Sequence, residues 1–185
     1  MENDGIVEFL HLLGKLKETK RTGWVENGIP GPESVSDHMY RAAVLCMMCP
    51  DPSLDKGRLI RMALCHDAGE CIVGDISPAM KVSESEKYMR EKEAVSFLTN
   101  LLPSNCPLTQ DLPRLWEEYE AQSTPEARFM KDIDILEMVT QAHAYEQANP
   151  GKDLGSFFAS GQKIRHPWAR EIFETLNNTR PSKKA

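Results

Sequence analysis

The sequence predicts an all-α protein, and three observations carry this prediction. Apolar residues recur at helical spacing in almost every segment, and no run shows sustained alternation with a period of two. Prolines and glycines gather between the apolar stretches, where they end helices. The chain has 185 residues, a length that suits one domain with one core. We therefore expect a single-domain helical bundle over residues 1–185.

The first two helices are expected on either side of a long loop. Residues 5–18 form an apolar stripe of Ile6, Phe9, Leu10, Leu13 and Leu16. Glycines and prolines break the pattern over 22–33, and a loop of that length in a compact domain is often functional. The second helix is predicted from Ser34, which resembles a capping box with Asp37, to about Met48.

The later helices follow the same signals. They are predicted over 55–72, 83–102, 115–122 and about 123–147, with one or two more over about 152–178. The helix over 123–147 has a strong start in Ser123-Thr124-Pro125-Glu126, which offers a capping hydroxyl and an early proline. We expect a core that bears the sequence motifs over about 5–148 and a frayed tail over 180–185.

Composition excludes several classes of protein. The net charge is −6, from 22 basic and 28 acidic residues, which argues against binding of nucleic-acid polymers. No apolar run approaches a membrane span, and the acidic start Met1-Glu2-Asn3-Asp4 does not resemble a signal peptide. The five cysteines form no small disulfide framework. These features predict a soluble, cytoplasmic protein without a membrane partner.

Four residues, far apart in the sequence, predict a metal site. His66 and Asp67 are adjacent, with His38 upstream and Asp134 downstream. Two imidazoles and two carboxylates can complete a mixed shell of nitrogen and oxygen around one divalent cation, with positions left for water and substrate. Their spacing is too long for one helix, so separate elements must converge. Open positions are typical of a catalytic metal site.

Further acids are expected beside this site. Glu70 follows His66 by four residues and Asp67 by three, so on one helix the three side chains would share a face. The flanking residues are apolar, and buried carboxylates are costly unless they are paired or bound to a cation. Together with Asp75 and Asp134, these acids would bring about four negative charges into one pocket, which a divalent cation would neutralise.

The sequence then resembles a known superfamily. Ser36-Asp37-His38, His66-Asp67 and Asp134 resemble the H…HD…D signature of the HD-domain metal-dependent phosphohydrolases. Within it, the closest resemblance is to the small 5′-deoxynucleotidases. It rests on Arg21-Thr22-Gly23-Trp24, Glu33-Ser34-Val35-Ser36-Asp37-His38, His66-Asp67-Ala68-Gly69-Glu70, Gly74-Asp75-Ile76 and Lys131-x-x-Asp134-x-x-Glu137-Met138. The match spans roughly residues 5–148 and implies an HD-type helical bundle.

The resemblance implies a reaction and a set of site residues. The substrate would be a deoxyribonucleoside 5′-monophosphate, and the enzyme would be a homodimer that needs Co²⁺, Mn²⁺, Mg²⁺ or Zn²⁺. The implied metal ligands are His38, His66, Asp67 and Asp134. Glu70 and Asp75 match acids that act in catalysis or hold a second metal with the Ile76 carbonyl, and Arg21 and Trp24 match a nucleotide-contacting loop. Two residues separate Arg21 from Trp24 here, whereas some relatives place them together.

The chemistry of these side chains suits such a reaction. Glu70 or Asp75 could orient the attacking water or deliver a proton to the leaving 5′ oxygen. The planar guanidinium of Arg21 could hold two phosphate oxygens in a fork that a lysine cannot reproduce. Trp24 could cover the sugar and restrict the room near its 2′ position.

Three alternatives stay open at this point. A cyclic-nucleotide phosphodiesterase of the HD type would add histidines before the last aspartate, but none lies between His66 and His143. A ppGpp hydrolase would resemble His-Asp-x-x-Glu-Asp, but Cys71 follows Glu70 here. The third alternative is a metal-stabilised helical interaction module without catalysis.

Three other features are predicted to be without catalytic function. Cys46 and Cys49 have no second cysteine pair at zinc-ribbon spacing, so we expect buried, inert thiols. Lys81 is expected as an exposed lysine near a helix start. The run Glu117–Glu120 is expected on a solvated helix face.

Overall fold

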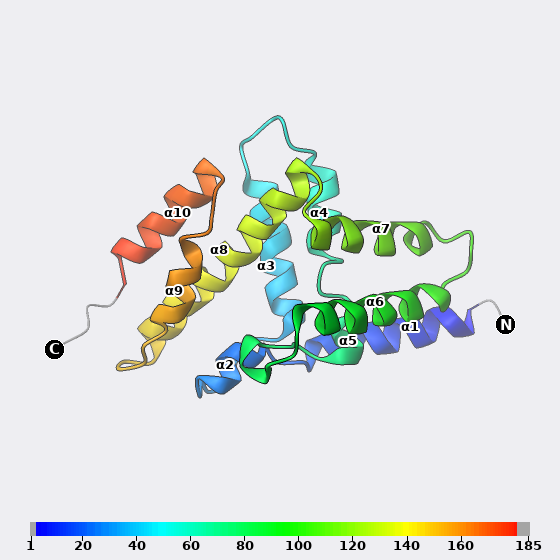
Figure 1. Ribbon diagram of the computed structural model, residues 1–185, viewed down its shortest axis with the longest axis horizontal. Coiled ribbons are helices and arrows are strands. Elements are labelled where there is room, and N and C mark those ends of the chain that lie inside the picture. Colours follow the sequence, from blue (N-terminus) through cyan, green and yellow to red (C-terminus); the bar gives the residue numbers. More distant parts are fainter. Residues whose placement is uncertain (1–2, 181–185) are drawn as a thin grey trace.

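The structure, a computed structural model, describes residues 3–180 and is a bundle of helices (Figure 1). Its α-helices are α1 (Asp4–Gly14), α2 (Thr22–Glu26), α3 (Val35–Met48), α4 (Lys56–Ala63), α5 (Glu70–Val73), α6 (Glu84–Asn100), α7 (Pro107–Ala121), α8 (Pro125–Ala148), α9 (Gly155–Gly161) and α10 (Pro167–Asn178). Two short 3₁₀ helices are η1 (Lys15–Lys17) and η2 (Pro78–Met80). Over the described range the only β pairing is one isolated bridge between Lys20 and Ser34. The all-α prediction is confirmed.

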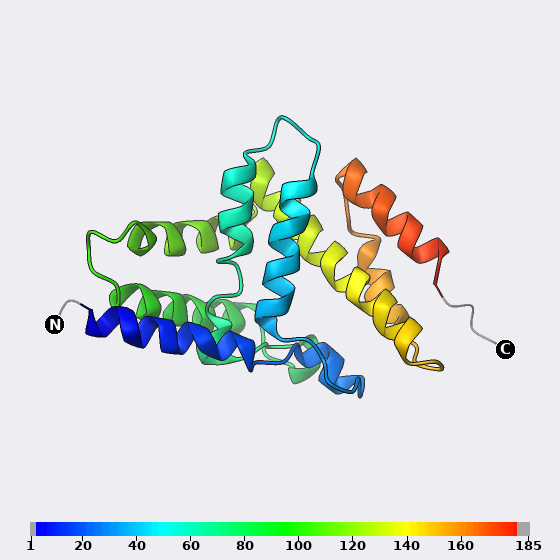
Figure 2. The same cartoon turned by 180° about the vertical axis from the view of Figure 1, so that it is seen from behind.

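The long helix α8 organises the bundle. Helices α3 and α4 pack on one side of it, and α9 and α10 pack on the other side (Figures 1 and 2). The pair α6 and α7 forms a further layer, and α7 also contacts α8. Large side chains such as Leu59, Met62, Met130, Ile133 and Leu136 are fully buried where these helices meet. Each such side chain contributes about 1.5–3 kcal/mol of hydrophobic stabilisation, and this burial holds α8 in the centre of the bundle. None of the helices within residues 3–180 combines the length and apolar character needed to cross a membrane.

The predicted helix over 55–72 was wrong in one important respect. Helix α4 ends at Ala63, and the chain turns over 64–69 before α5 begins at Glu70. The amide of His66 still donates to the Met62 carbonyl at 2.9 Å, but Ala68 donates to the nearer Cys65 carbonyl. A Cβ at Gly69 would lie 3.2 Å from a backbone oxygen of α6, so the small residue allows the turn to approach that helix. His66 and Asp67 therefore lie in a turn. Their side chains can point in directions that two neighbouring residues of one helix could not both take.

One other predicted helix boundary is confirmed and two differ. The capping box is confirmed, because the Asp37 amide donates to Ser34 Oγ and the Ser34 amide to Asp37 Oδ2. The loop predicted over 22–33 contains the short helix α2, and the helix predicted over 115–122 begins at Pro107 instead. Proline fits the first turn of a helix, where its missing N–H costs nothing, so Pro107 marked a start rather than a loop. The predicted frayed tail, apart from Arg180, lies outside the described residues.

Candidate metal centre and active site

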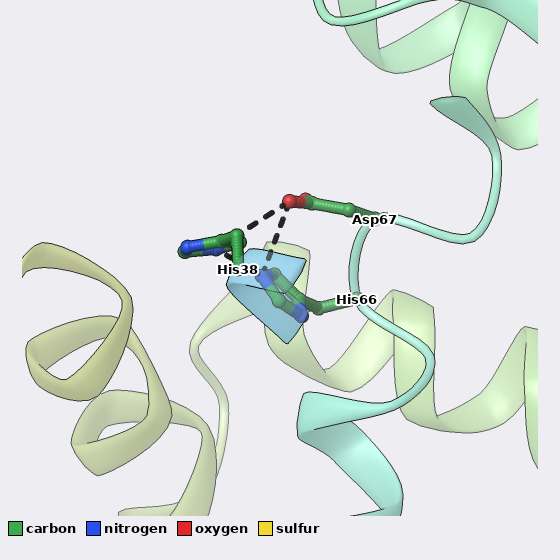
Figure 3. A group of neighbouring side chains, drawn as sticks. All are labelled: His38, His66 and Asp67. Carbon is green, nitrogen blue, oxygen red and sulfur yellow. Dashed lines mark hydrogen bonds and ion pairs between the residues drawn. The ribbon is translucent and has the colours of Figure 1, made fainter. Parts of the chain in front are cut away.

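Three of the four predicted ligands converge on one point. His38 lies in the first turns of α3, and His66 and Asp67 lie in the turn between α4 and α5 (Figure 3). The two Nε2 atoms are 3.4 Å apart, and Asp67 Oδ2 is 3.7 Å from His38 Nε2 and 3.3 Å from His66 Nε2. Both imidazoles are buried, and Asp67 is partly exposed.

The fourth predicted ligand stands beside this group. Asp134 Oδ1 on α8 is 3.3 Å from His38 Nε2, while Asp134 lies outside the set of three whose ligand atoms are all within 4.8 Å of one another. Its other oxygen, Oδ2, accepts hydrogen bonds from Tyr119 Oη at 2.7 Å and Lys131 Nζ at 2.9 Å. One oxygen of Asp134 is thus fixed by protein donors, and the other faces the histidines.

The arrangement fits a divalent cation. Atoms bonded to one ion at about 2.1 Å would be about 3.0–3.4 Å apart at neighbouring corners of an octahedron or tetrahedron. Among His38, His66 and Asp67 the observed separations of 3.3–3.7 Å need only a small contraction. Asp134 is close to His38 but would have to move nearer to the rest of the group. His66 Nδ1 donates to the Ala63 carbonyl at 2.9 Å, and His38 Nδ1 makes a very short hydrogen bond to Glu137. In both rings the remaining nitrogen, Nε2, can therefore offer its lone pair to a metal.

The two histidines have different electrostatic surroundings. Burial and Arg21 lower the pKa of His38, but the carboxylates of Glu137 and Asp134 outweigh them and raise that pKa to about 10. At His66 burial prevails over Asp67 and lowers the pKa. In the absence of a cation, His38 thus balances part of the local negative charge as an imidazolium. A bound divalent cation would take over that role.

Glu70 is buried in the pocket with one carboxyl oxygen that lacks a hydrogen-bond partner among the described residues. The side chain is 3% exposed, and the oxygen concerned is Oε2. Burial raises its pKa well above the usual value, and the nearby carboxylates of Asp67 and Asp75 add to the shift. Burial therefore favours the neutral acid at Glu70, in a position where a cation or a substrate would meet its free oxygen.

Asp75 and Arg21 are joined through the start of α2. Asp75 Oδ2 accepts the amide hydrogen of Thr22, and the Thr22 hydroxyl donates to the Asp75 carbonyl at 2.6 Å. Gly74, at a φ of 77°, turns the chain into this contact in a conformation that favours glycine. Arg21 Nη1 lies 3.4 Å from Asp67 Oδ2 and 3.9 Å from Asp75 Oδ1. The guanidinium is thereby placed beside the candidate metal ligands.

Trp24 is a wall of the pocket rather than a mobile cover. It is 1% exposed, and its Nε1 donates to Glu33 Oε1 at 2.9 Å. Its ring packs against Phe157 of α9, with centroids 4.3 Å apart, and against the edge of Tyr145. A Cβ at Gly23 would come within 3.2 Å of Phe157, so this glycine permits the close packing.

These residues enclose one cavity of about 200 Å³. Its lining includes the predicted residues Arg21, Trp24, Asp67, Glu70, Asp75, Ile76 and Asp134. It also includes residues that the sequence reasoning missed, namely Lys87, Glu91, Tyr119, Glu120, Lys131, Met138 and Phe157. The spacing of Lys131, one turn before Asp134, was the available signal for one of them. Lys87 and Lys131 add positive charge that suits an anionic substrate.

One prediction near the cavity was only half right. In the run Glu117–Glu120 the two outer residues are exposed, whereas Glu118 and Tyr119 are buried, at 7% and 4% exposed. Two neighbouring residues of a helix point in different directions, and here Glu118 pairs with Arg58 whereas Tyr119 reaches Asp134. By contrast, Cys46 and Cys49 are buried as expected. Lys81 is exposed and does not line the cavity.

The comparison with known families defines the class of protein. The family model of the HD domain matches residues 13–176 of this chain. This match covers most of the chain, so the protein belongs to the HD domain family.

Individual proteins that the chain resembles give more detail than the family model. The chain is 47% identical over 180 residues to 5′-deoxynucleotidase HDDC2 of Danio rerio, covering 96% of this chain and 88% of that protein. It is 45% identical over 177 residues to 5′-deoxynucleotidase HDDC2 of Homo sapiens, covering 95% and 86%. Among solved structures, a conserved hypothetical protein from Pyrococcus furiosus superposes with a TM-score of 0.75 at 32% identity, covering 93% of this chain and 99% of that one.

Proposed function

We propose that this protein is a metal-dependent 5′-deoxynucleotidase, which hydrolyses deoxyribonucleoside 5′-monophosphates to a deoxynucleoside and phosphate. The observation that carries the proposal is the position of Arg21, in one cavity with Glu70 and with Asp67 of the histidine–aspartate cluster. The near full-length similarity to 5′-deoxynucleotidases supports the same reaction.

The metal would be held by His38, His66, Asp67 and Asp134. When bound, a divalent cation activates water at neutral pH and neutralises charge on the phosphoryl group. Mixed nitrogen and oxygen sites of this kind accept several divalent ions, among them Co²⁺, Mn²⁺, Mg²⁺ and Zn²⁺. A second ion on Glu70, Asp75 and the Ile76 carbonyl stays a prediction.

The protein side chains then position the ester and move the proton. Arg21 binds phosphate oxygens through its fork of N–H donors, and Asp75 holds the start of α2 that carries this arginine. As the bond between phosphorus and the 5′ oxygen breaks, Glu70 donates its proton to that oxygen. The attacking water supplies the new oxygen of the released phosphate, and the proton that this water loses returns to Glu70. Burial favours the neutral form of Glu70 and so suits it to this role as an acid.

The nucleoside would lie against the apolar side of the cavity. Trp24, Met138 and Phe157 line that side, and the fixed indole restricts the room near the 2′ carbon of the sugar. Location in the cytoplasm and assembly as a homodimer remain predictions from the sequence and the family resemblance.

A substrate panel tests the proposal most directly. Protein treated with a chelator should lose phosphatase activity and recover it with Co²⁺ or Mn²⁺. The recovered enzyme should prefer 5′-deoxynucleotides over ribonucleotides, 3′-nucleotides, cyclic nucleotides and ppGpp. Preferred turnover of a cyclic nucleotide or of ppGpp would favour the other hydrolases of this superfamily. Metal that stabilises the fold without any turnover would favour the interaction module.

A further inference from the structure

The side of His38 that faces away from the metal cluster is held by a second carboxylate. Glu137 Oε2 accepts a very short hydrogen bond from His38 Nδ1, and both side chains are 0% exposed. Glu137 follows Asp134 by three residues on α8, so both side chains leave the same face of that helix. Asp134 therefore faces Nε2 of the ring, and Glu137 faces Nδ1.

Arg41 holds Glu137 in turn. Its Nε donates to Glu137 Oε1 at 2.7 Å, and its Nη2 donates to the same oxygen. Arg41 stands three residues after His38 on α3, so the metal-facing histidine and the arginine share a helix face. Nη2 also donates to Gln141 Oε1 at 2.6 Å. The carboxylate of Glu137 thus bridges a histidine and an arginine from α3, with both of its oxygens occupied.

The same arginine reaches the wall of the pocket. Arg41 Nη2 lies 3.5 Å from Glu33 Oε2, and Glu33 Oε1 accepts the indole hydrogen of Trp24 at 2.9 Å. The Glu33 amide donates to Tyr145 Oη on α8 at 2.8 Å. A continuous chain of hydrogen bonds therefore runs from His38 through Glu137, Arg41 and Glu33 to Trp24.

We propose that Glu137 and Arg41 are positioning residues that build the metal site and the Trp24 wall as one unit. Glu137 fixes the His38 tautomer and ring direction, so that Nε2 points at the cluster. Arg41 donates hydrogen bonds to both Glu137 and Glu33. A change at either carboxylate therefore alters the position of the arginine, and through it both His38 and Trp24. Partners of this kind typically change metal affinity 10- to 100-fold when they are lost. The inference rests on the proposed metal site but not on the identity of the substrate.

The first experiment measures metal affinity without substrate. The dissociation constant for Co²⁺ is obtained by competition with a chelating dye for the wild type and for Glu137→Gln. We expect Glu137→Gln to bind about 10- to 100-fold more weakly, with a shifted ¹⁵N signal of His38 Nδ1 in the metal-free protein, because its carboxylate partner has become an amide. Unchanged affinity and an unchanged His38 signal would overturn the proposal, whatever happens to turnover.

A matched control separates positioning from general stability. Glu146 lies on the same helix, is also buried, and accepts two hydrogen bonds from the fork of Arg180. Glu146→Gln should lower the melting temperature as Glu137→Gln does, yet keep the wild-type affinity for Co²⁺. An equal loss of affinity in both variants would mean that Glu137 acts only through stability, and the proposal would fail.

The second experiment follows the link to Trp24. The indole N–H signal of Trp24, assigned by its absence in Trp24→Phe, is recorded in the metal-free protein. Arg41→Met should shift this signal and also weaken Co²⁺ binding, whereas Glu146→Gln should change neither. If Arg41→Met leaves both unchanged, the shared support is refuted. A wild type that binds Co²⁺ but hydrolyses no deoxynucleotide would refute the proposed function while these results still stand.

Discussion

Asp134 and Glu70 are two carboxyl groups of one cavity, and their hydrogen bonds and electrostatic surroundings are opposite in character. Asp134 has one oxygen held by Tyr119 and Lys131 and the other beside His38, whereas Glu70 has an oxygen without any hydrogen-bond partner among the described residues. Burial would raise the pKa of both. At Asp134, Lys131 and His38 outweigh burial and hold the pKa well below its usual value. At Glu70, burial acts together with other carboxylates and the pKa rises.

This difference supports the different roles proposed for Asp134 and Glu70. A carboxylate kept ionised by fixed donors is suited to bind a cation. A carboxyl group kept neutral by burial is suited to give up a proton during the reaction. Pairs whose surroundings push their pKa values apart are a general mark of acid and base assignments in active sites. The proposed function thus uses the same side-chain chemistry for metal binding at Asp134 and for proton transfer at Glu70.

Removal of the ionised carboxylate should have the largest effect. Asp134→Ala loses the oxygen that faces His38 and leaves the cation Lys131 without its carboxylate partner. Turnover should fall by about three orders of magnitude, more than the 10- to 100-fold typical of supporting residues, with a matching loss of bound metal measured by elemental analysis. Asp132→Asn is the control, because Asp132 accepts backbone hydrogens of Arg165 and His166 away from the cluster. Full metal content in Asp134→Ala would contradict its role as a ligand.

Replacement of the neutral acid should affect chemistry instead of binding. Glu70→Gln keeps the size of the side chain but cannot donate an acidic proton. We expect kcat to fall about 100-fold, the usual loss for a proton-transfer group, while the metal content stays close to that of the wild type. Steady-state kinetics with a saturating 5′-deoxynucleotide checks this. If Glu70→Gln loses its metal and Asp134→Ala does not, the two assignments must be exchanged.

The same pair predicts opposite stability effects in the metal-free protein. The pKa of Glu70 is raised on folding, so the stability it contributes is complete below its unfolded value near 4.5 and is lost as the pH rises through the folded value. Glu70→Gln should therefore melt above the wild type at pH 8 and gain less at pH 5, by a few degrees at about 2–4 °C per kcal/mol. Asp134→Asn should melt below the wild type at pH 8, since that carboxylate is stabilised in its charged form. Thermal melts at both pH values test the two signs.

Arg21 offers a test of ground-state binding. Its guanidinium faces Asp67 and Asp75 and would exchange these partners for phosphate oxygens. Arg21→Ala should raise KM about tenfold with a smaller change in kcat, because it removes a contact present before the transition state. Arg21→Lys should not restore the wild-type KM, since an ammonium group lacks the planar fork. A large fall in kcat at unchanged KM would place Arg21 in the chemical step instead.

Much of the fold and part of the site could be read from the sequence. The cap at Ser34 and the start of α8 are set by residues three or four apart, and such local signals are visible in a sequence. The convergence of His38, His66 and Asp67 followed from residue type. The turn over 64–69 was invisible, because apolar periodicity continues across it. Tyr119 could not be found either, since its partner Asp134 lies on another helix and only packing brings them together.

Tyr119 gives the smallest and most selective test of the comparison. Its hydroxyl is one of the two donors that hold Asp134 Oδ2, and its ring packs edge-on against His66. Tyr119→Phe keeps the ring and removes the donor, while Lys131 still holds the same oxygen. Metal affinity should fall only about three- to fivefold, in line with a net contribution of about 1 kcal/mol for one hydrogen bond. The pH dependence of melting should shift toward that of Asp134→Asn, because a carboxylate with one donor fewer is less stabilised in its charged form. Tyr88→Phe, which removes a surface hydrogen bond to Glu117, is the matched control and should change neither quantity. An affinity loss as large as that of Asp134→Ala would mean that Tyr119, and not Lys131, keeps this carboxylate ready for the metal.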